Sequence, residues 1–179
     1  MLFRPRTAHP FSMFLKPLAL SLALVSGLWI YAPLPTQAQN IIDFEKGDTD
    51  MARAVAQARK SLDPMLTRLM GSGTKAPDTF LLKVSFPVSD GGHEIIWVRN
   101  ITRDGTAYFG RLDNKPRDIK GAREGSKISF ALASVEDWSW DGPDGLLYGN
   151  YTTRVMLPLM SPKNSAYLKS ILSPHPVPK

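Results

Sequence analysis

The sequence contains no cysteine. Without a thiol the chain cannot form a disulfide bond, carry a lipid on a lipobox cysteine, build a thiolate metal site or use a cysteine nucleophile. Histidine is scarce as well, because residues 39–179 contain only His93 and His175. Two distant histidines make a poor transition-metal site, so we expect neither a metal nor another cofactor.

Strong charge is missing from most of the chain. Half of the formal net charge of +6 comes from Arg4, Arg6 and Lys16, which lie in a leading segment without acids. Residues 39–179 hold nineteen basic and sixteen acidic side chains, a net charge of +3. This excess is well short of the basic footprint of nucleic-acid-binding proteins, so we expect no nucleic-acid partner.

The first 38 residues have the features of a signal peptide. The mostly apolar run over 18–32 is shorter than the ~20 residues that a membrane-spanning helix needs, and "PTQA" supplies a cleavage site after Ala38. Met13 is an alternative start. We expect a periplasmic or secreted protein that contacts the membrane only through this leader, before cleavage. The absence of disulfides is compatible with a periplasm, where they are permitted but not required.

Residues 48–160 predict one α+β domain, in which an N-terminal helix packs on a curved antiparallel sheet of five to six strands. An arm over 39–47 precedes this domain, and a short helix with a proline-rich tail follows over 161–179. Apolar residues between Met51 and Leu69 recur at i, i+3, i+4, i+7 spacing, which indicates the helix. Pro64 predicts either a kink or two helices in series.

From residue 79 the apolar period changes to two, which is typical of strands. "TFLLKVSF" alternates cleanly, whereas "HEIIWVRNI" is apolar on both faces, as a central strand would be. An Asp-Gly turn leads to "TAYFGRL", and the remaining predicted strands are "KISFALA", "VEDWSW" and "LLYGNYTTRVML". "NSAYLKSIL" predicts a short helix, and the tail "SPHPVPK" predicts an extended or disordered segment.

The stretch "EDWSWDGPDGLLYGNYTTR" (136–154) gathers aromatic and polar residues in a predicted hairpin. In the first strand, alternation would place Glu136, Trp138 and Trp140 on one face and Val135, Asp137 and Ser139 on the other. In the second strand, it would place on one face Tyr148, Asn150, Thr152 and Arg154. Such a surface would suit a sugar or a peptide. Alternatively, Trp138 lies in the core and Asp137 or Glu136 pairs with Arg154.

Carboxylates near these aromatic residues are weak catalytic candidates. Glu94 and Asp137 are the leading ones, with Glu136 as a substitute for Asp137, and Asp141 and Asp144 are the other candidates near these rings. A glycoside hydrolase needs two carboxyl groups at about 5–5.5 Å or about 6.5–9.5 Å, and a sequence does not supply that distance. Most such acids are turn or surface groups.

A basic stretch runs over 111–127, with a net charge of +3. It could contact anionic lipid, lipopolysaccharide, peptidoglycan or an acidic protein. The alternative is a solvated loop with local ion pairs, which is the usual role of a charge run.

Six motifs follow one another over residues 50–157. They are "MARAVAQARKSL", "HEIIWVRNI" (Glu94, Trp97, Val98), "GRLDNKP" (Gly110, Leu112, Asn114, Pro116), "REGSKISF", "VEDWSW" (Asp137, Trp138) and "YGNYTTR" (Gly149, Thr152, Arg154). This order resembles the bacterial YegJ-like family, catalogued as domain of unknown function 2314. The resemblance implies a fold and candidate positions but no activity. Ile95 departs from the family, whose members often have histidine there.

The family positions also have structural interpretations. Asn114 and Pro116 are typical of a turn, and Gly110 and Gly149 indicate places where a neighbour or a strand bend excludes a side chain.

Three hypotheses follow for the function. The first is a non-enzymatic domain that binds an unknown protein partner or envelope component, with the candidate binding residues Trp97, Asn114, Trp138, Trp140, Tyr148, Thr152 and Arg154. The second is an envelope glycan-active enzyme that uses Glu94 with Asp137 or Glu136. The third is a purely structural module held by an Asp137–Arg154 pair.

The leader gives a direct prediction. Protein recovered from the producing cell should begin at Gln39, because signal peptidase cuts after a small residue such as Ala38. Mass spectrometry of the intact protein checks this, and a full-length mass would contradict cleavage.

Overall fold

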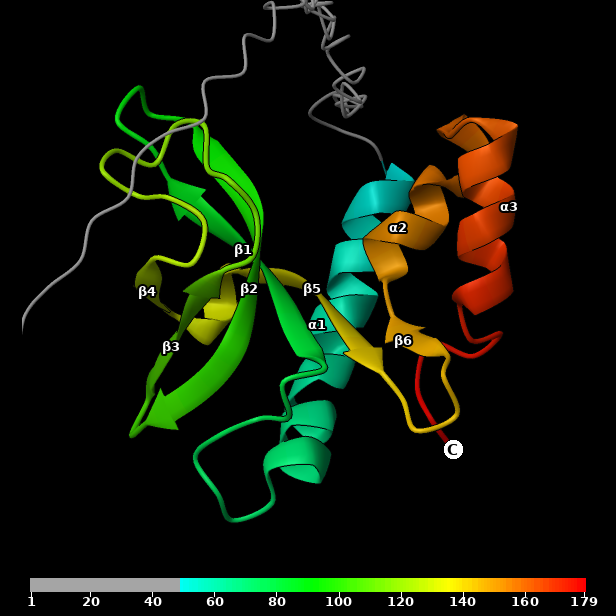
Figure 1. The fold of residues 1–179 in the computed structure, drawn as a ribbon, viewed down its shortest axis with the longest axis horizontal. Helices are drawn as coiled ribbons and strands as arrows, with labels where there is room; N and C mark the ends of the chain where they lie inside the picture. Colours follow the sequence, from blue (N-terminus) through cyan, green and yellow to red (C-terminus); the bar gives the residue numbers. More distant parts are fainter. Residues whose placement is uncertain (1–48) are drawn as a thin grey trace, which may run out of the picture. The chain divides into compact units, whose positions relative to one another are not determined.

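A computed structural model describes residues 49–179 of the chain (Figure 1). The predicted leader, its cleavage site and the arm over 39–47 lie outside the described residues. The elements of the described part are, in chain order, α1 (Thr49–Met70), β1 (Phe80–Pro87), β2 (His93–Asp104), β3 (Ala107–Leu112), β4 (Lys127–Phe130), η1 (Leu132–Ser134), β5 (Val135–Asp141), β6 (Leu147–Gly149), α2 (Tyr151–Met156), η2 (Leu157–Leu159) and α3 (Pro162–Ile171).

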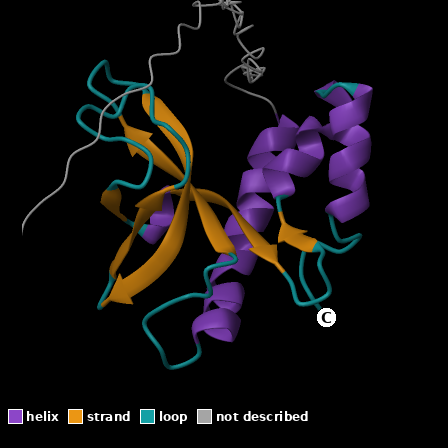
Figure 2. Cartoon of the chain, viewed as in Figure 1, coloured by secondary structure: helices purple, strands orange, loops and turns teal. Residues whose placement is uncertain are grey.

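The six strands form one antiparallel sheet in the order β4-β3-β2-β1-β5-β6. Helices lie on the β5 side, and α1 runs past β5 with α2 next to it (Figures 1 and 2). The α+β prediction of a helix on an antiparallel sheet is confirmed. Among the described helices, none combines the length and the apolar character that crossing a membrane requires.

Helix α1 is a single 22-residue helix with Pro64 inside it, so the alternative of two helices in series is wrong. The periodic apolar residues produce its buried face, which consists of Ala54, Ala58, Leu62, Met65, Leu66 and Met70. Asp50 in the first turn and Arg68 in the last complement the helix dipole. This places the Arg68 guanidinium at the end of the helix that borders the site described below.

Alternation in β1 builds the centre of the core. Phe80, Leu82 and Val84 have no exposed surface, as the period of two predicts. In β2 the buried face carries Ile96 and Val98, but Ile95 is 46% exposed on the other face. The expectation of a strand covered on both faces is therefore wrong, although β2 does have a strand on each side.

A β-bulge changes the predicted faces of β5. Trp138 pairs with Leu82 and Asp137 with Lys83, but Val84 pairs with Val135, which leaves Glu136 as the extra residue. Trp138 and Trp140 stay on one face as predicted. The prediction that groups Glu136 with Trp138, and Val135 with Asp137, is wrong because a bulge shifts the alternation by one position.

Strand β6 ends at Gly149, so the prediction of a long strand through 157 is wrong. Gly149 and Asn150 have positive φ values of 70° and 55°, and α2 starts directly afterwards. A Cβ on Gly149 would overlap the backbone and ring of Trp138, so both the conformation and the space require glycine. A Cβ on Gly110 would likewise overlap Val98. Thr152 and Arg154 thus lie on a helix, not on a strand.

The last residues, 173–179, are called the C-terminal segment below. Leu172, just before it, bridges to Leu147 in β6. The Ser173 amide donates to the Leu147 carbonyl at 2.9 Å, and the Gly149 amide donates to the Pro176 carbonyl at 2.7 Å. The tail bends over residues 174–177 rather than running extended, and it packs beside β6.

Candidate functional site

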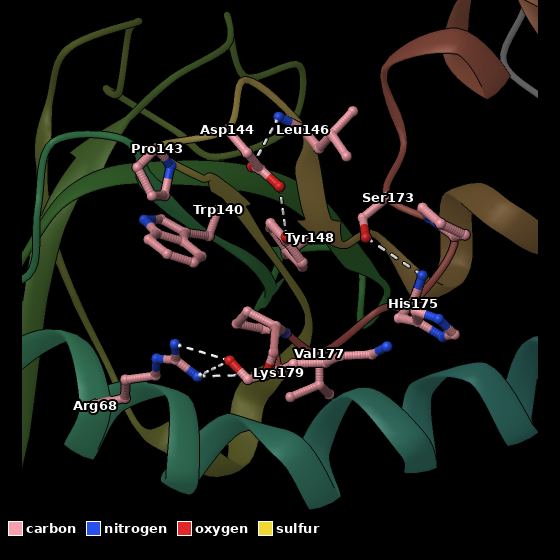
Figure 3. A pocket seen from close by; sticks show the side chains of 12 residues that line it. Arg68, Trp140, Pro143, Asp144, Leu146, Tyr148, Ser173, His175, Val177 and Lys179 are labelled. Carbon is pink, nitrogen blue, oxygen red and sulfur yellow. Dashed lines mark hydrogen bonds between the residues drawn. The ribbon is translucent and has the colours of Figure 1, made fainter.

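A pocket of about 400 Å³ opens between the β5–β6 hairpin, the end of α1 and the C-terminal segment. We call it the Trp140 pocket (Figure 3). Its lining residues are Arg68, Trp140, Pro143, Asp144, Leu146, Tyr148, Ser173, Pro174, His175, Val177, Pro178 and Lys179. Its volume and its mixture of rings, aliphatic groups and a few polar groups are those of a ligand site.

Two aromatic rings form one wall of this pocket. Trp140 and Tyr148 lie opposite each other in the β5–β6 pair, with ring centroids 5.5 Å apart. The Tyr148 hydroxyl donates to Asp144 Oδ2 at 2.8 Å. This bond raises the pKa of Tyr148 and lowers that of Asp144. Asp144 in the β5–β6 loop therefore holds the Tyr148 ring in place.

The opposite wall comes from the chain's own C-terminal segment. Arg68 donates from its guanidinium to the carbonyl oxygens of Pro178 and Lys179 at 3.3–3.4 Å. The Ser173 hydroxyl accepts from the His175 amide at 3.3 Å. Residues more than a hundred positions apart in the sequence are thus brought to one site, and α1 holds the segment in place.

A buried carboxylate network lies behind the hairpin. Asp137 has no exposed surface. Its Oδ1 accepts from the amides of Trp138 and Tyr151 at 2.8 and 3.1 Å. Its Oδ2 accepts from the Thr152 amide and hydroxyl, both at 2.7 Å.

Asp137 supplies the N-terminal cap that α2 otherwise lacks. The residue before the helix, Asn150, makes no capping bond with its side chain, which instead donates to Ser139 and to the Tyr148 carbonyl. Burial raises the pKa of Asp137, and the four donors and the positive end of the helix oppose that shift. The carboxylate thus satisfies amides that the first helical turn leaves unpaired.

Lys83 extends the network across β1. Its Nζ donates to Thr152 Oγ1 at 3.1 Å and lies 6.0 Å from the centre of the Trp97 ring. Burial lowers the pKa of Lys83, while Asp137 and Glu136 act in the opposite direction. Trp97 is half-buried on this face, away from the Trp140 pocket.

The predicted pair of Asp137 with Arg154 is not formed, since no ion pair joins these two described residues. Arg154 Nε donates to the Gly149 carbonyl at 3.0 Å, and its Nη2 is buried without a partner. Burial lowers the pKa of Arg154. Arg154 therefore holds the β6–α2 turn rather than a carboxylate.

Trp138 belongs to the core, as one of the predicted alternatives states. It has no exposed surface, and its Nε1 donates to the Ala58 carbonyl and the Ser61 hydroxyl of α1 at 3.2 and 3.0 Å. Its ring also packs against Phe80 and Tyr151. Trp138 thus fastens α1 to the sheet and does not face a partner.

Glu94 anchors the loop between β3 and β4. Its carboxylate accepts from the amides of Arg117, Asp118 and Ile119 at 2.7, 2.9 and 3.1 Å. Burial raises its pKa, but these bonds and the Arg117 charge outweigh that effect, so the pKa of Glu94 is lowered. The predicted turn around Asn114 is exposed at the start of this loop.

The two catalytic candidates do not face a common site. Glu94 pairs with Phe86 and lies on the buried face, whereas Asp137 pairs with Lys83 on the other. Positions 83 and 86 are about 10 Å apart along a strand, and backbone amides already occupy both carboxylates. This geometry does not fit a pair of catalytic carboxyl groups. Among residues 49–179, no three His, Asp or Glu side chains are grouped so that they could hold a metal.

The structure thus separates the seven predicted binding residues. Trp140 and Tyr148 meet in the pocket, whereas Trp138, Thr152 and Arg154 hold the fold. Trp97 and Asn114 lie elsewhere on the surface. Sequence reasoning named Asp144 among the acids near these rings but missed Arg68 and the C-terminal segment, and the only signal for the last was its prolines.

We predict that Asp137→Asn destabilises the domain by about 2–4 kcal/mol, because an amide oxygen cannot accept all four bonds and its NH₂ faces donors. Urea unfolding at pH 7 checks this. The control is Asp141→Asn, an exposed β5 residue, which should change the stability by less than about 0.5 kcal/mol. Equal stability of the two variants would contradict the capping role.

Glu94→Gln should destabilise the protein by about 1–3 kcal/mol at pH 7. Because the folded pKa is lowered, the wild-type advantage is present above the ordinary value of 4.5 and is lost as the pH falls through the folded value. Urea unfolding across this pH range checks the sign. Glu124→Gln, exposed on the same loop, is the control, and an advantage that grows on acidification would rule the anchor out.

Comparison with known proteins supplies a family but no activity. A putative ankyrin repeat protein of Neisseria meningitidis serogroup B is 26% identical over 118 residues, which are 63% of this chain and 46% of the relative. The chain therefore matches less than half of that protein's length. No solved structure matches. The family model described as an uncharacterized protein conserved in bacteria (DUF2314) matches residues 48–171, and the chain belongs to this family.

Proposed function

We propose that the domain is a non-catalytic binding domain, which holds an extended segment of a protein partner in the Trp140 pocket. The observation that carries this proposal is the pocket itself. It combines two half-buried aromatic rings with an arginine, a carboxylate and a histidine in a volume of about 400 Å³. Aromatic rings and arginine are the residue types that dominate binding energy at protein interfaces.

The bonds of the C-terminal segment favour a peptide as the occupant. Along β6, backbone groups at Leu147 and Gly149 bond to this proline-containing segment. Arg68 donates only to carbonyl oxygens of the same segment. Aromatic-lined grooves recognise peptides through such backbone contacts. The site thus already accommodates a chain of the proposed kind.

The glycan-active enzyme has less support. Its two carboxylates, Glu94 and Asp137, each accept several backbone hydrogen bonds, which stabilise local structure. The relative named as a putative ankyrin repeat protein is consistent with interaction, because ankyrin repeats form extended binding surfaces. The partner is proposed to lie in the periplasm, on the strength of the sequence features of the leader.

Site-specific photo-crosslinking in the producing bacterium tests this function. A photoreactive residue in place of Trp140 should give one discrete adduct, because the ring lies in the pocket. The control position is Tyr167, which is 64% exposed on α3, and it should give none. Urea unfolding verifies that both variants are folded.

The outcomes are distinct. An adduct that protease removes supports a protein partner. An adduct that resists protease but is removed by lysozyme would point to peptidoglycan and refute the proposal. The same adducts from both positions, or none from position 140, would show that the pocket is not a binding site.

A further inference from the structure

A row of three cations crosses the sheet far from the Trp140 pocket. Arg99 in β2 lies directly opposite Arg111 in β3, and Arg111 lies directly opposite Lys127 in β4. These strands lie side by side at the end of the sheet away from β6 (Figure 1). Neighbouring strands are about 4.8 Å apart, so the three side chains start within about 10 Å. We call them the cation row.

The row lies on the outer face of the sheet. The adjacent pair Val98 and Leu112 is fully buried, and side chains alternate between faces. Arg111 and Lys127 are accordingly exposed, and Arg99 is half-buried. Arg111 and Lys127 are the two ends of the basic stretch over 111–127, and the fold makes them neighbours.

Among residues 49–179, one carboxylate forms an ion pair with the row. Asp113 accepts from Arg99 Nε at 3.0 Å. Arg111 Nη1 donates to the Gly125 carbonyl at 2.9 Å, and Lys127 Nζ lies 5.4 Å from the centre of the Phe109 ring. Within residues 49–179, neither Arg111 nor Lys127 forms an ion pair. Like charges directly opposite each other repel in a sheet, and a bound anion would reduce this repulsion.

Apolar groups flank the row on the same face. Ile95 and Trp97 precede Arg99 at two-residue intervals along β2, and Phe109 precedes Arg111 in β3. Ile95 is 46% exposed, and the two rings are half-buried. Aromatic residues and arginine are enriched at protein interfaces.

We infer that this face, formed by the cation row and its apolar flank, binds an acidic segment of a protein partner. Charge complementarity requires anions, since three cations face one carboxylate. The open sheet face carries apolar groups beside the cations, which matches a protein segment with carboxylates and aliphatic side chains. The low net charge of residues 39–179 argues against a nucleic acid. This surface is separate from the Trp140 pocket and does not depend on it.

The experiment measures binding of a fluorescent peptide with alternating glutamate and leucine to the purified full chain. The double variant Arg111→Gln/Lys127→Gln removes two charges of the row. It should weaken binding by roughly tenfold, the sum expected for two surface ion pairs. The control Arg117→Gln/Lys120→Gln removes the same charge from exposed residues of the intervening loop and should weaken binding less than twofold.

Three further controls separate the alternatives. The same peptide with glutamine in place of glutamate should not bind. Added salt should weaken binding of the acidic peptide, because it screens the charges. Trp140→Ala should leave this binding unchanged, so that failure of the pocket and failure of this face are distinguishable. Urea unfolding verifies that the row variant is folded, because the substitutions remove like-charge repulsion but also the Arg111 bond to the Gly125 carbonyl.

Three results would overturn the inference. Equal loss in both double variants would show attraction to net charge alone. Unchanged binding in the row variant would place the acidic peptide elsewhere. Tighter binding of polyphosphate or of anionic phospholipid vesicles than of the acidic peptide, lost in the row variant, would assign the face to a different class of partner.

Discussion

The carboxylate of Asp137 is the contact on which the second half of the domain depends. It joins β5 to the first turn of α2 through the amides of Tyr151 and Thr152 and the Thr152 hydroxyl. The direction of α2 follows from this contact, and α3 and the C-terminal segment follow α2 in the chain. Asp137 therefore helps to position the wall of the Trp140 pocket that the C-terminal segment forms, although Asp137 does not line the pocket itself. A capping residue distant in sequence lets the helix begin directly after a left-handed residue at Asn150.

Glu94 does for the loop after β3 what Asp137 does for α2. Both carboxylates accept hydrogen bonds from backbone amides. The presence of these two acids in the family motifs is thus explained by the fold, without a substrate. Gly110 and Gly149 belong to the same group, because close neighbours leave no room for a side chain. Most motif positions thus specify the fold. What remains for recognition is aromatic and cationic: one pocket at the β6 end of the sheet and one row at the β4 end.

Local sequence patterns predicted much of this fold but not the contacts between residues that are distant in the sequence. The apolar spacing of α1 and the alternation of β1 depend on short-range sequence order and were visible. The bulge at Glu136 was not, because it depends on how β5 aligns with Lys83 and Val84. The early end of β6 was missed because "YTTRVM" contains the β-branched residues typical of strands, and the cap from Asp137 overrides that preference. At the site, the pairing of Trp140 with Tyr148 followed from the hairpin. Arg68 could not be foreseen, since only the folded chain brings it to the C-terminal segment.

The C-terminal segment has a practical consequence for anyone who handles this protein. It is held to the rest of the domain by a few backbone bonds along β6 and by one guanidinium, yet it supplies one wall of the Trp140 pocket. Occupancy of the pocket and order of the segment are therefore thermodynamically linked, each favouring the other. An affinity tag fused after Lys179 would emerge from the rim of the pocket itself and compete with whatever binds there, whereas a tag ahead of α1 would leave this wall as it is.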